Sequence, residues 1–322
     1  MKLLCIIFHL KESSFGWAVE NGTLFLYLVF PTAPCLLQVT IRFRQEDHMR
    51  HIKVDQEKCR HDGICTAVCP MSIIEMKDGL VPQLVAGLED LCISCGHCVA
   101  VCPHGALSLD EMQVADCPPI RAELALASEQ AEQFFRSRRS IRTYSSQAVE
   151  QEKLARLIDL AHYAPTGTNS QQVQWLVINS RQELHAMGAM IIDMLRSLIK
   201  AGHPLAKAYR LERSVAAWEA GKDPVLRGAP ALVIAHAPAS YPLAQMDSTI
   251  ALTFLDLAAP TVGLGACWAG FFMMAAAQSP QLQEALALPE GHACCGALMI
   301  GYPKYAYHRL PTRKEPAVSW RK

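Results

Sequence analysis

Two runs of cysteines carry the most specific chemical pattern in this sequence. They are KCRHDGICTAVCP at 58–70 and LCISCGHCVAVCP at 91–103. The second run has the spacing Cys-x2-Cys-x2-Cys-x3-Cys-Pro, formed by Cys92, Cys95, Cys98 and Cys102. In the first run an aspartate stands where the second cysteine belongs, so the corresponding residues are Cys59, Asp62, Cys65 and Cys69.

The two runs are copies of one unit. Cys59 and Cys92 lie 33 positions apart (92 − 59), and the three following pairs, Asp62 included, keep the same offset. A chance cluster of cysteines would not repeat its register in this way. We therefore interpret Asp62 as the second ligand position of an internal duplication.

This spacing suits two iron–sulfur clusters. Two-residue gaps let one loop place three thiolates around a cluster, while the fourth cysteine reaches the neighbouring cluster and the proline turns the chain away. A zinc site is the alternative, but zinc sites pair their cysteines across a longer spacer. Residues 50–112 resemble bacterial-type two-cluster ferredoxins. The expected ligands are Cys59, Asp62, Cys65 and Cys102 for the first cluster, and Cys69, Cys92, Cys95 and Cys98 for the second.

Asp62 makes the two clusters unequal. A carboxylate is a harder ligand than a thiolate, so it should hold iron less covalently. Three outcomes are open: Asp62 ligates a complete [4Fe–4S] cluster, the site loses that iron and holds [3Fe–4S], or a hydroxide takes the position. The neighbouring His97 and His104 are interpreted as loop or cap residues.

The composition excludes several classes of protein. The chain has 322 residues, 51% hydrophobic, with 30 basic and 30 acidic side chains, which favours a folded core and disfavours nucleic-acid binding. Seven of its 13 cysteines fall between 59 and 102, which argues against a secreted disulfide framework. The apolar stretch 24–39 is short for a membrane span and contains two prolines. We expect a cytoplasmic protein.

The domain boundaries follow from these patterns. Residues 1–48 show no motif and no clear helix or strand period, so they are either a genuine extension or the product of a misassigned start, with Met49 as the true first residue. The ferredoxin-type domain is expected at 49–112. A linker with an Ala-, Glu-, Leu- and Gln-rich helix is expected at 113–133, and the remaining domain at 134–322.

Four further motifs follow in order along the last domain. They are RRSIR at 138–142, APTGTNSQ at 164–171, GLGACWAG at 263–270, and a buried strand that leads into the basic loop of GALMIGYPKYAYHRLPTRK at 296–314. Together they resemble the nitroreductase family of flavin enzymes over residues 134–316. The resemblance implies an α+β fold with a central, mainly antiparallel sheet and helices on both faces. It also implies FMN bound at the interface of a homodimer.

The resemblance also implies which residues hold FMN. Arg138, Ser140 and Arg142 should contact the phosphate, ribityl chain or pyrimidine edge, and Asn169 should reach the ring. The glycine loop, with Gly265 and Gly270, should let backbone pack against the ring. Arg313 and Arg309 should reach the phosphate, since arginine binds phosphate with two parallel hydrogen bonds. No catalytic residue is assigned.

Some features depart from the family pattern or remain open. The family has Gln-Pro-Trp after the asparagine, whereas Gln171 is followed here by Gln172, Val173, Gln174 and only then Trp175. Segment 185–228 is either a lid over the flavin or part of the packing. Cys294 and Cys295 lie in an apolar run and are interpreted as buried structural residues.

The expected function is that of an iron–sulfur flavoprotein oxidoreductase. It would pass electrons from an external donor through the clusters to FMN, and then to a small electrophilic acceptor such as a nitroaromatic or quinone. Two alternatives remain: a nitroreductase driven by NAD(P)H, and a non-catalytic electron carrier or redox sensor that holds flavin.

Overall fold

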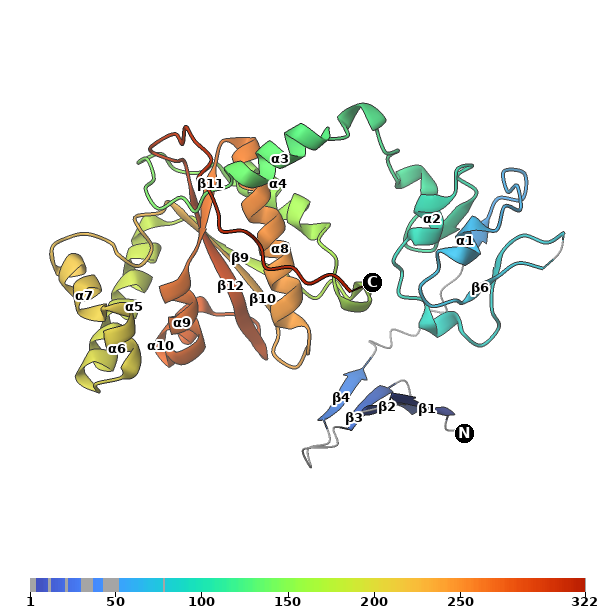
Figure 1. Cartoon of the computed structure of the whole chain (residues 1–322), viewed down its shortest axis with the longest axis horizontal. Coiled ribbons are helices and arrows are strands. Elements are labelled where there is room, and N and C mark those ends of the chain that lie inside the picture. Colours follow the sequence, from blue (N-terminus) through green and yellow to red (C-terminus); the bar gives the residue numbers. More distant parts are fainter. Residues whose placement is uncertain are drawn as a thin grey trace. The chain divides into compact units, whose positions relative to one another are not determined.

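The computed structural model describes residues 4–10, 13–20, 23–29, 37–42, 52–77 and 79–321. The chain divides into two compact units, Met1–Ile120 and Arg121–Lys322, and each is described by itself (Figure 1). No helix within the described residues is both long and apolar enough to cross a membrane.

The first unit begins with a four-stranded antiparallel meander in the order β1-β2-β3-β4. Its strands are β1 (Leu4–Leu10), β2 (Ser13–Glu20), β3 (Thr23–Val29) and β4 (Leu37–Arg42). No strand period was predicted here. Runs such as TLFLYLV in β3 are almost continuously apolar and hide a two-residue alternation, whereas LQVTIR in β4 does alternate and was overlooked. The question of a start at Met49 is untested by these strands.

The cysteine runs lie in a small domain built from short elements. Strand β5 pairs with β8 in antiparallel fashion, and β6 pairs with β7. A compact apolar core with Ile73, Val99 and Leu107 holds these elements together. The elements are β5 (Ile52–Val54), α1 (Ile64–Ala67), β6 (Ile74–Glu75), β7 (Gln83–Leu84), η1 (Glu89–Leu91), α2 (His97–Val101) and β8 (Leu107–Leu109).

The backbone of this domain repeats with the same 33-residue offset as the cysteines. Both short helices, α1 and α2, begin after a glycine with φ of 70°. Left-handed backbone recurs at three equivalent pairs of positions: His61 and Ser94, Gly63 and Gly96, Ser72 and Gly105. The duplication inferred from the sequence therefore extends to the turns that direct the ligands.

In residues 113–137, directly after this domain, the chain forms two single turns and one helix. They are η2 (Val114–Asp116), η3 (Ala122–Leu124) and α3 (Ser128–Ser137). The helix starts later than the composition of 113–133 suggested and runs past its end. Pro118 and Pro119 exclude regular helix only around their own positions. The single turn η3 follows them, and α3 starts after Ala127, whose N–H donates to the side chain of Gln130 at 3.0 Å.

The second unit is built on a four-stranded sheet in the order β11-β12-β10-β9, and every neighbouring pair is antiparallel. The two central strands are almost entirely buried. This confirms the expected antiparallel sheet. The strands are β9 (Gln174–Ile178), β10 (Ala231–Pro238), β11 (Gly265–Trp268) and β12 (His292–Gly301).

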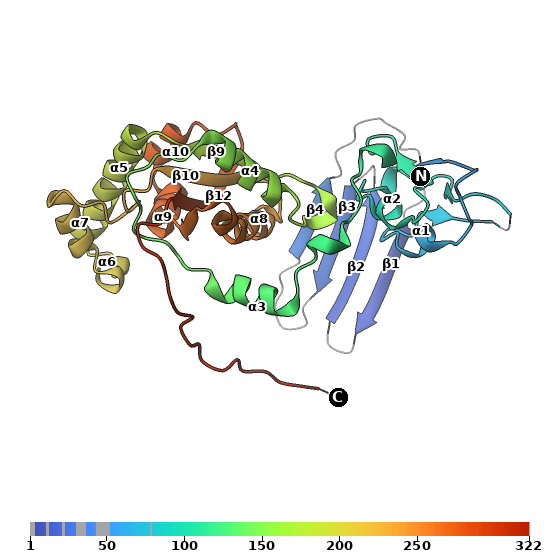
Figure 2. The same ribbon diagram turned by 90° about the horizontal axis from the view of Figure 1, so that it is seen from above.

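Helices cover both faces of this sheet, as expected (Figures 1 and 2). One core cluster joins the sheet to α5, α9 and α10, and the other joins it to α4 and α8. The inner face of α5 is fully buried at Ile191, Ile192 and Leu195, so this part of segment 185–228 serves packing. The bounds are α4 (Gln151–His162), η4 (Gly167–Asn169), α5 (Arg181–Lys200), α6 (Pro204–Tyr209), α7 (Leu211–Glu219), α8 (Ala244–Ala258), η5 (Ala259–Val262), α9 (Gly270–Gln278) and α10 (Pro280–Leu286).

The thiol of Cys294 should resist alkylation in the folded protein. Burial raises the pKa of Cys294 to about 11, from an ordinary value of 9.0. Because the thiolate is the reactive form, iodoacetamide at pH 8 should modify Cys294 about a hundredfold more slowly in the folded than in the unfolded protein. Peptide mass spectrometry over a time course would measure both rates. Equal rates would show that this thiol is not buried.

Candidate functional site

Four of the expected iron ligands line one hollow in the small domain. Cys59, Asp62, Cys65 and Cys102 surround an empty volume of about 310 Å³. Cys102 comes from the second run and the other three from the first. His104 also lines this hollow from the turn that follows Cys102, in keeping with its interpretation as a loop residue beside the ligands.

The other four ligands line a second hollow. Cys92, Cys95 and Cys98 meet Cys69 of the first run around an empty volume of about 330 Å³. All eight side chains are thus divided as the spacing predicted, with one cysteine exchanged between the runs. Among the described residues, no group of three or more His, Cys, Asp or Glu is arranged to hold a single metal ion.

The chemistry of these side chains suits a cationic iron cluster. Burial raises the pKa of Cys65, and the charges of Asp62 and Cys102 raise it further. Burial together with Cys92 and Cys95 raises the pKa of Cys98 to about 11. Gathering thiolates in this way is unfavourable unless a positively charged metal centre compensates them, so the residues fit the clusters implied by their spacing.

Asp62 has a second contact besides the hollow. Its Oδ1 accepts a hydrogen bond from the backbone N–H of Ile64 at 3.2 Å, at the start of α1. A carboxylate has two oxygens with several acceptor positions, so this cap leaves capacity for an iron atom. Asp62 therefore supports the helix that carries Cys65 and also faces the hollow.

In the second unit, the segment that contains the RRSIR motif is fixed along the edge of the sheet. The N–H of Ile141 donates to the carbonyl of Ala266 on β11 at 2.9 Å. The hydroxyl of Tyr144 donates to the carbonyl of Ile141 at 2.7 Å and lies 3.3 Å from that of Met299. Ile141 is buried against Gly265, where an added Cβ would lie 2.3 Å from its Cγ1. In an extended chain alternate side chains point to opposite sides, so burying Ile141 turns Ser140 and Arg142 the other way.

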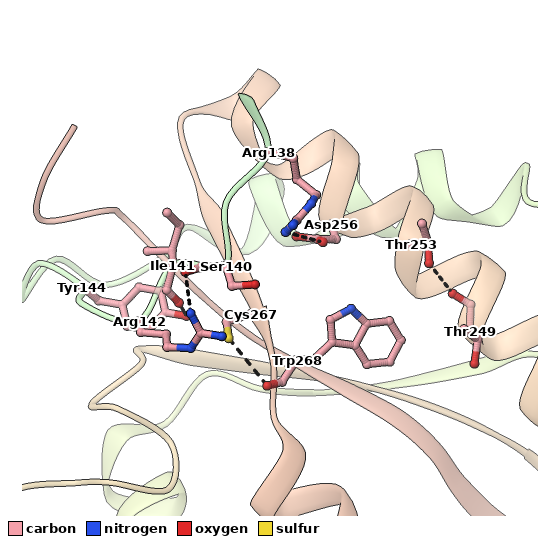
Figure 3. A network of polar contacts seen from close by, with 10 residues as sticks. All are labelled: Arg138, Ser140, Ile141, Arg142, Tyr144, Thr249, Thr253, Asp256, Cys267 and Trp268. Atoms are coloured by element: carbon pink, nitrogen blue, oxygen red, sulfur yellow. Dashed lines mark hydrogen bonds and ion pairs between the residues drawn. The ribbon is translucent and has the colours of Figure 1, made fainter. Parts of the chain in front are cut away.

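Arg138 pairs with a buried acid on α8 (Figure 3). Its Nη1 lies 3.4 Å from Oδ2 of Asp256, whose side chain is 8% exposed. Burial raises the pKa of Asp256, and Arg138 partly offsets this. The other carboxylate oxygen of Asp256 is buried without a hydrogen-bond partner. The sequence did not indicate a role for Asp256. Its contact with Arg138 joins residues more than a hundred positions apart, and no local pattern predicts such a contact.

Arg142 lies beside the buried thiol of Cys267 (Figure 3). Burial raises the pKa of Cys267, and two arginines, Arg142 and Arg227, lower it. The sequence interpretation missed Arg227. It sits in left-handed backbone with φ of 61°, in a loop whose N–H groups at 225, 226 and 228 all donate to the carboxylate of Asp223. An Asp followed by closely spaced N–H donors and a glycine is a turn pattern that could have drawn attention to it.

The other predicted flavin residues are not brought to this place within one chain. Asn169 lies in a loop bonded to Asp247 near the start of α8, whereas Arg138 reaches Asp256 nine residues later, which is about 13 Å along a helix. Gly270 is the exposed first residue of α9. Arg309 and Arg313 are exposed in the segment that follows β12.

The arginine side of the site fits an anionic group such as a phosphate. Arg138 and Arg142 come from one extended segment. Arg142 and Arg227 both lie near two buried side chains, Tyr144 and Cys267, and both lower the pKa of these groups. Of these three guanidinium groups, only Arg138 pairs with a carboxylate of the described residues, at 3.4 Å. Arginines gathered in this way can bind phosphate oxygens through charged hydrogen bonds.

Comparisons with known proteins agree with both parts of the chain. Residues 135–302 match the model of the nitroreductase family, and residues 40–107 match that of the 4Fe–4S dicluster domain. A protein of Archaeoglobus fulgidus named as an NADH dehydrogenase/NAD(P)H nitroreductase is 26% identical over 168 residues, which cover 52% of this chain and 82% of that protein. A ferredoxin of Methanocaldococcus jannaschii is 44% identical over 55 residues, 16% of this chain and 31% of that protein.

The fold has a solved counterpart. The crystal structure of a nitroreductase with bound FMN from Bacteroides fragilis superposes with a TM-score of 0.50 at 21% identity, covering 60% of this chain and 99% of that one. The fold and the site thus define a flavoprotein-type α+β domain preceded by an iron–sulfur module. The chain belongs to the nitroreductase family, as the motif order had indicated, and a 4Fe–4S dicluster domain precedes its nitroreductase domain.

Two glycines of the predicted site should respond differently to alanine. At Gly265 a new Cβ would lie 2.3 Å from Ile141 and 3.1 Å from Pro303, so Gly265→Ala should destabilise the domain by about 1–3 kcal/mol. At Gly270 nothing lies within 4 Å of a new Cβ, so Gly270→Ala should change stability by about 0.5 kcal/mol or less. Denaturant unfolding followed by circular dichroism would measure both. Equal losses would contradict the tight contact at Gly265.

Proposed function

We propose that this chain is an FMN-dependent oxidoreductase that takes up electrons through its dicluster domain and delivers them to a small electrophilic acceptor. The observation that carries the proposal is the pair of hollows, each lined by four cluster-type ligands, in the same chain as a nitroreductase domain. When bound, iron–sulfur clusters accept single electrons and FMN accepts one or two, so together they would link a one-electron donor to a two-electron reaction.

The protein's own residues would bind and orient these groups. The eight ligands divide between the hollows as 59, 62, 65, 102 and 69, 92, 95, 98. Arg138, Ser140 and Arg142 would hold the phosphate and ribityl end of FMN, with Arg227 as an additional cation and Gly265 and Gly270 next to the ring. Arg309 and Arg313 would complete the phosphate contacts, and Asn169 would bind the ring.

We propose a homodimer in which two chains complete each flavin site, because the family resemblance implies FMN at a subunit interface and Arg309 and Arg313 are exposed in the segment that follows β12. The acceptor would be a nitroaromatic or a quinone, since an open flavin site selects flat electrophiles.

The donor would be a reduced ferredoxin or NAD(P)H. A reductant panel of reduced ferredoxin, NADH and NADPH with anaerobically purified protein separates a ferredoxin-fed enzyme from one driven by NAD(P)H. Turnover with none of them would favour an electron carrier.

The first test concerns FMN itself. Arg142→Ala removes a guanidinium expected to hold the flavin, and losing a hydrogen bond to a charged group should weaken FMN binding by about tenfold to a hundredfold. Titration of flavin-free protein, followed by flavin fluorescence, would give the affinity. Arg156→Ala is a matched control, because Arg156 is an exposed arginine on α4 paired only with its neighbour Asp159 at 3.0 Å. If both variants bind FMN like the parent, the arginine segment is not the phosphate site.

The second test concerns Asp62. Because a carboxylate holds iron less covalently than a thiolate, mild oxidation should release one iron from the first cluster and leave the second intact. Electron paramagnetic resonance should show a [3Fe–4S] signal in the parent that disappears in Asp62→Cys. Asp62→Asn keeps an acceptor for the cap to Ile64 and should retain the signal.

Asp55→Asn is the control for the general effect of removing an acidic side chain close to the cluster ligands. Asp55 accepts N–H bonds from residues 57 and 58 in a turn shortly before Cys59. This variant should behave as the parent does. Two equally robust [4Fe–4S] centres in the parent would show that Asp62 is not a weak ligand.

A further inference from the structure

A buried carboxylate anchors the loop that carries Asn169. Asp247 lies in the first turn of α8 and is only 2% exposed. Both of its oxygens accept from the backbone N–H of Gly167, at 3.2 Å each. The start of a helix favours a negative charge, so a carboxylate suits this position.

Tyr241 joins this anchor to the far end of the loop. Its hydroxyl donates to Oδ2 of Asp247 at 2.6 Å and lies 2.7 Å from the hydroxyl of Ser170. Burial, followed by the bond to Asp247, raises the pKa of Tyr241 to about 12, so the hydroxyl stays protonated at neutral pH and can donate. The loop is thus bonded on both sides of Asn169, at residues 167 and 170.

The loop needs such an anchor because its backbone is unfavourable. Thr168, Asn169 and Gln171 all have positive φ, at 51°, 54° and 48°. Residues other than glycine adopt this conformation only when surrounding contacts compensate its cost, and such strain concentrates at functional sites. Gly167 also packs so closely that a Cβ there would lie 2.1 Å from Cδ1 of Leu243.

We propose that Asp247 and Tyr241 are positioning residues for flavin binding, which hold Asn169 in its left-handed conformation so that it can reach the ring. This inference rests on the proposed function, because it takes Asn169 as a flavin contact. It adds two residues that lie outside every motif of the sequence. A carboxylate is needed because one group must accept from the Gly167 N–H and the Tyr241 hydroxyl together.

The test compares flavin binding with global stability. Asp247→Ala removes the anchor. Tyr241→Phe keeps the ring but removes the hydroxyl contacts to Asp247, to Ser170 and, at 3.5 Å, to the carbonyl of Gly167. Asp247→Asn keeps an acceptor for the Gly167 N–H while losing the charge. Ser279→Ala is the control, because Ser279 caps α10 by accepting from the Leu282 N–H at 3.3 Å. For each purified full-length protein we would measure FMN affinity by fluorescence, the visible circular dichroism of the bound flavin, and the melting temperature.

We expect Asp247→Ala to weaken FMN binding at least tenfold and to change the visible circular dichroism. Tyr241→Phe should follow in the same direction with a smaller loss, and Asp247→Asn should recover part of the affinity. Ser279→Ala should lower the melting temperature and leave both flavin readouts unchanged. If Asp247 has only a structural role, Asp247→Ala will lower the melting temperature and leave both flavin readouts unchanged, as the control Ser279→Ala does.

The outcomes separate this inference from the proposed function. If the parent binds FMN and all three loop variants bind it equally well with the same spectrum, Asp247 and Tyr241 do not position Asn169, and the proposed function stands. If the parent binds no FMN, the proposed function is wrong and this inference is overturned with it. Should Asp247→Ala fail to fold, Tyr241→Phe and Asp247→Asn decide the matter.

Discussion

The close packing of Ile141 on Gly265 determines how the arginine segment presents its side chains. No Cβ fits between them, and the N–H of Ile141 is bonded to the neighbouring residue of β11 at 2.9 Å. Burying this one isoleucine orients the residues next to it, because alternate side chains of an extended segment point to opposite sides, and it leaves Arg142 exposed. Tyr144 strengthens the arrangement, because its buried hydroxyl bonds back to Ile141. The apolar contact of Ile141 with Gly265, which has no side chain, therefore positions the segment, and the arginines of the segment are placed as a result.

A comparable dependence joins the two halves of the dicluster domain. Cys69 of the first run lines the second hollow, and Cys102 of the second run lines the first. Each hollow thus lacks a ligand until the other half is in place. The left-handed turns at Gly63 and Gly96 recur at matching positions and start the two short helices in the same way. Duplication with exchange makes the two metal sites one cooperative unit, in which Asp62 is the single departure from symmetry among the eight ligand positions.

The sequence predicted what depends on local spacing and missed what depends on distant contacts. The ligand register and the aspartate in place of a cysteine at position 62 could be read from the spacing of neighbouring residues, and the antiparallel sheet was implied by the family resemblance. Asp247, Tyr241, Asp256 and Arg227 could not, since each acquires its role from a partner brought near by the fold. Strands β1 and β3 were missed because their apolar runs are almost continuous, whereas the alternation of β4 (LQVTIR) was present and was overlooked. The composition of 113–133 indicated a helix but did not show where it begins.

Helix α8 relates the two ends of the proposed flavin site. Asp247 lies in its first turn, where the helix dipole favours a carboxylate and the Gly167 N–H and Tyr241 hydroxyl satisfy it. Asp256 lies near its last turn, where the dipole opposes a negative charge and burial raises the pKa. The folded chain therefore binds a proton at Asp256 more readily than the unfolded chain, and this residue costs stability as pH rises through its raised pKa. Such a cost is tolerable only with a cation beside it. Arg138 supplies that cation, which ties the first arginine of the motif to the same helix that anchors Asn169.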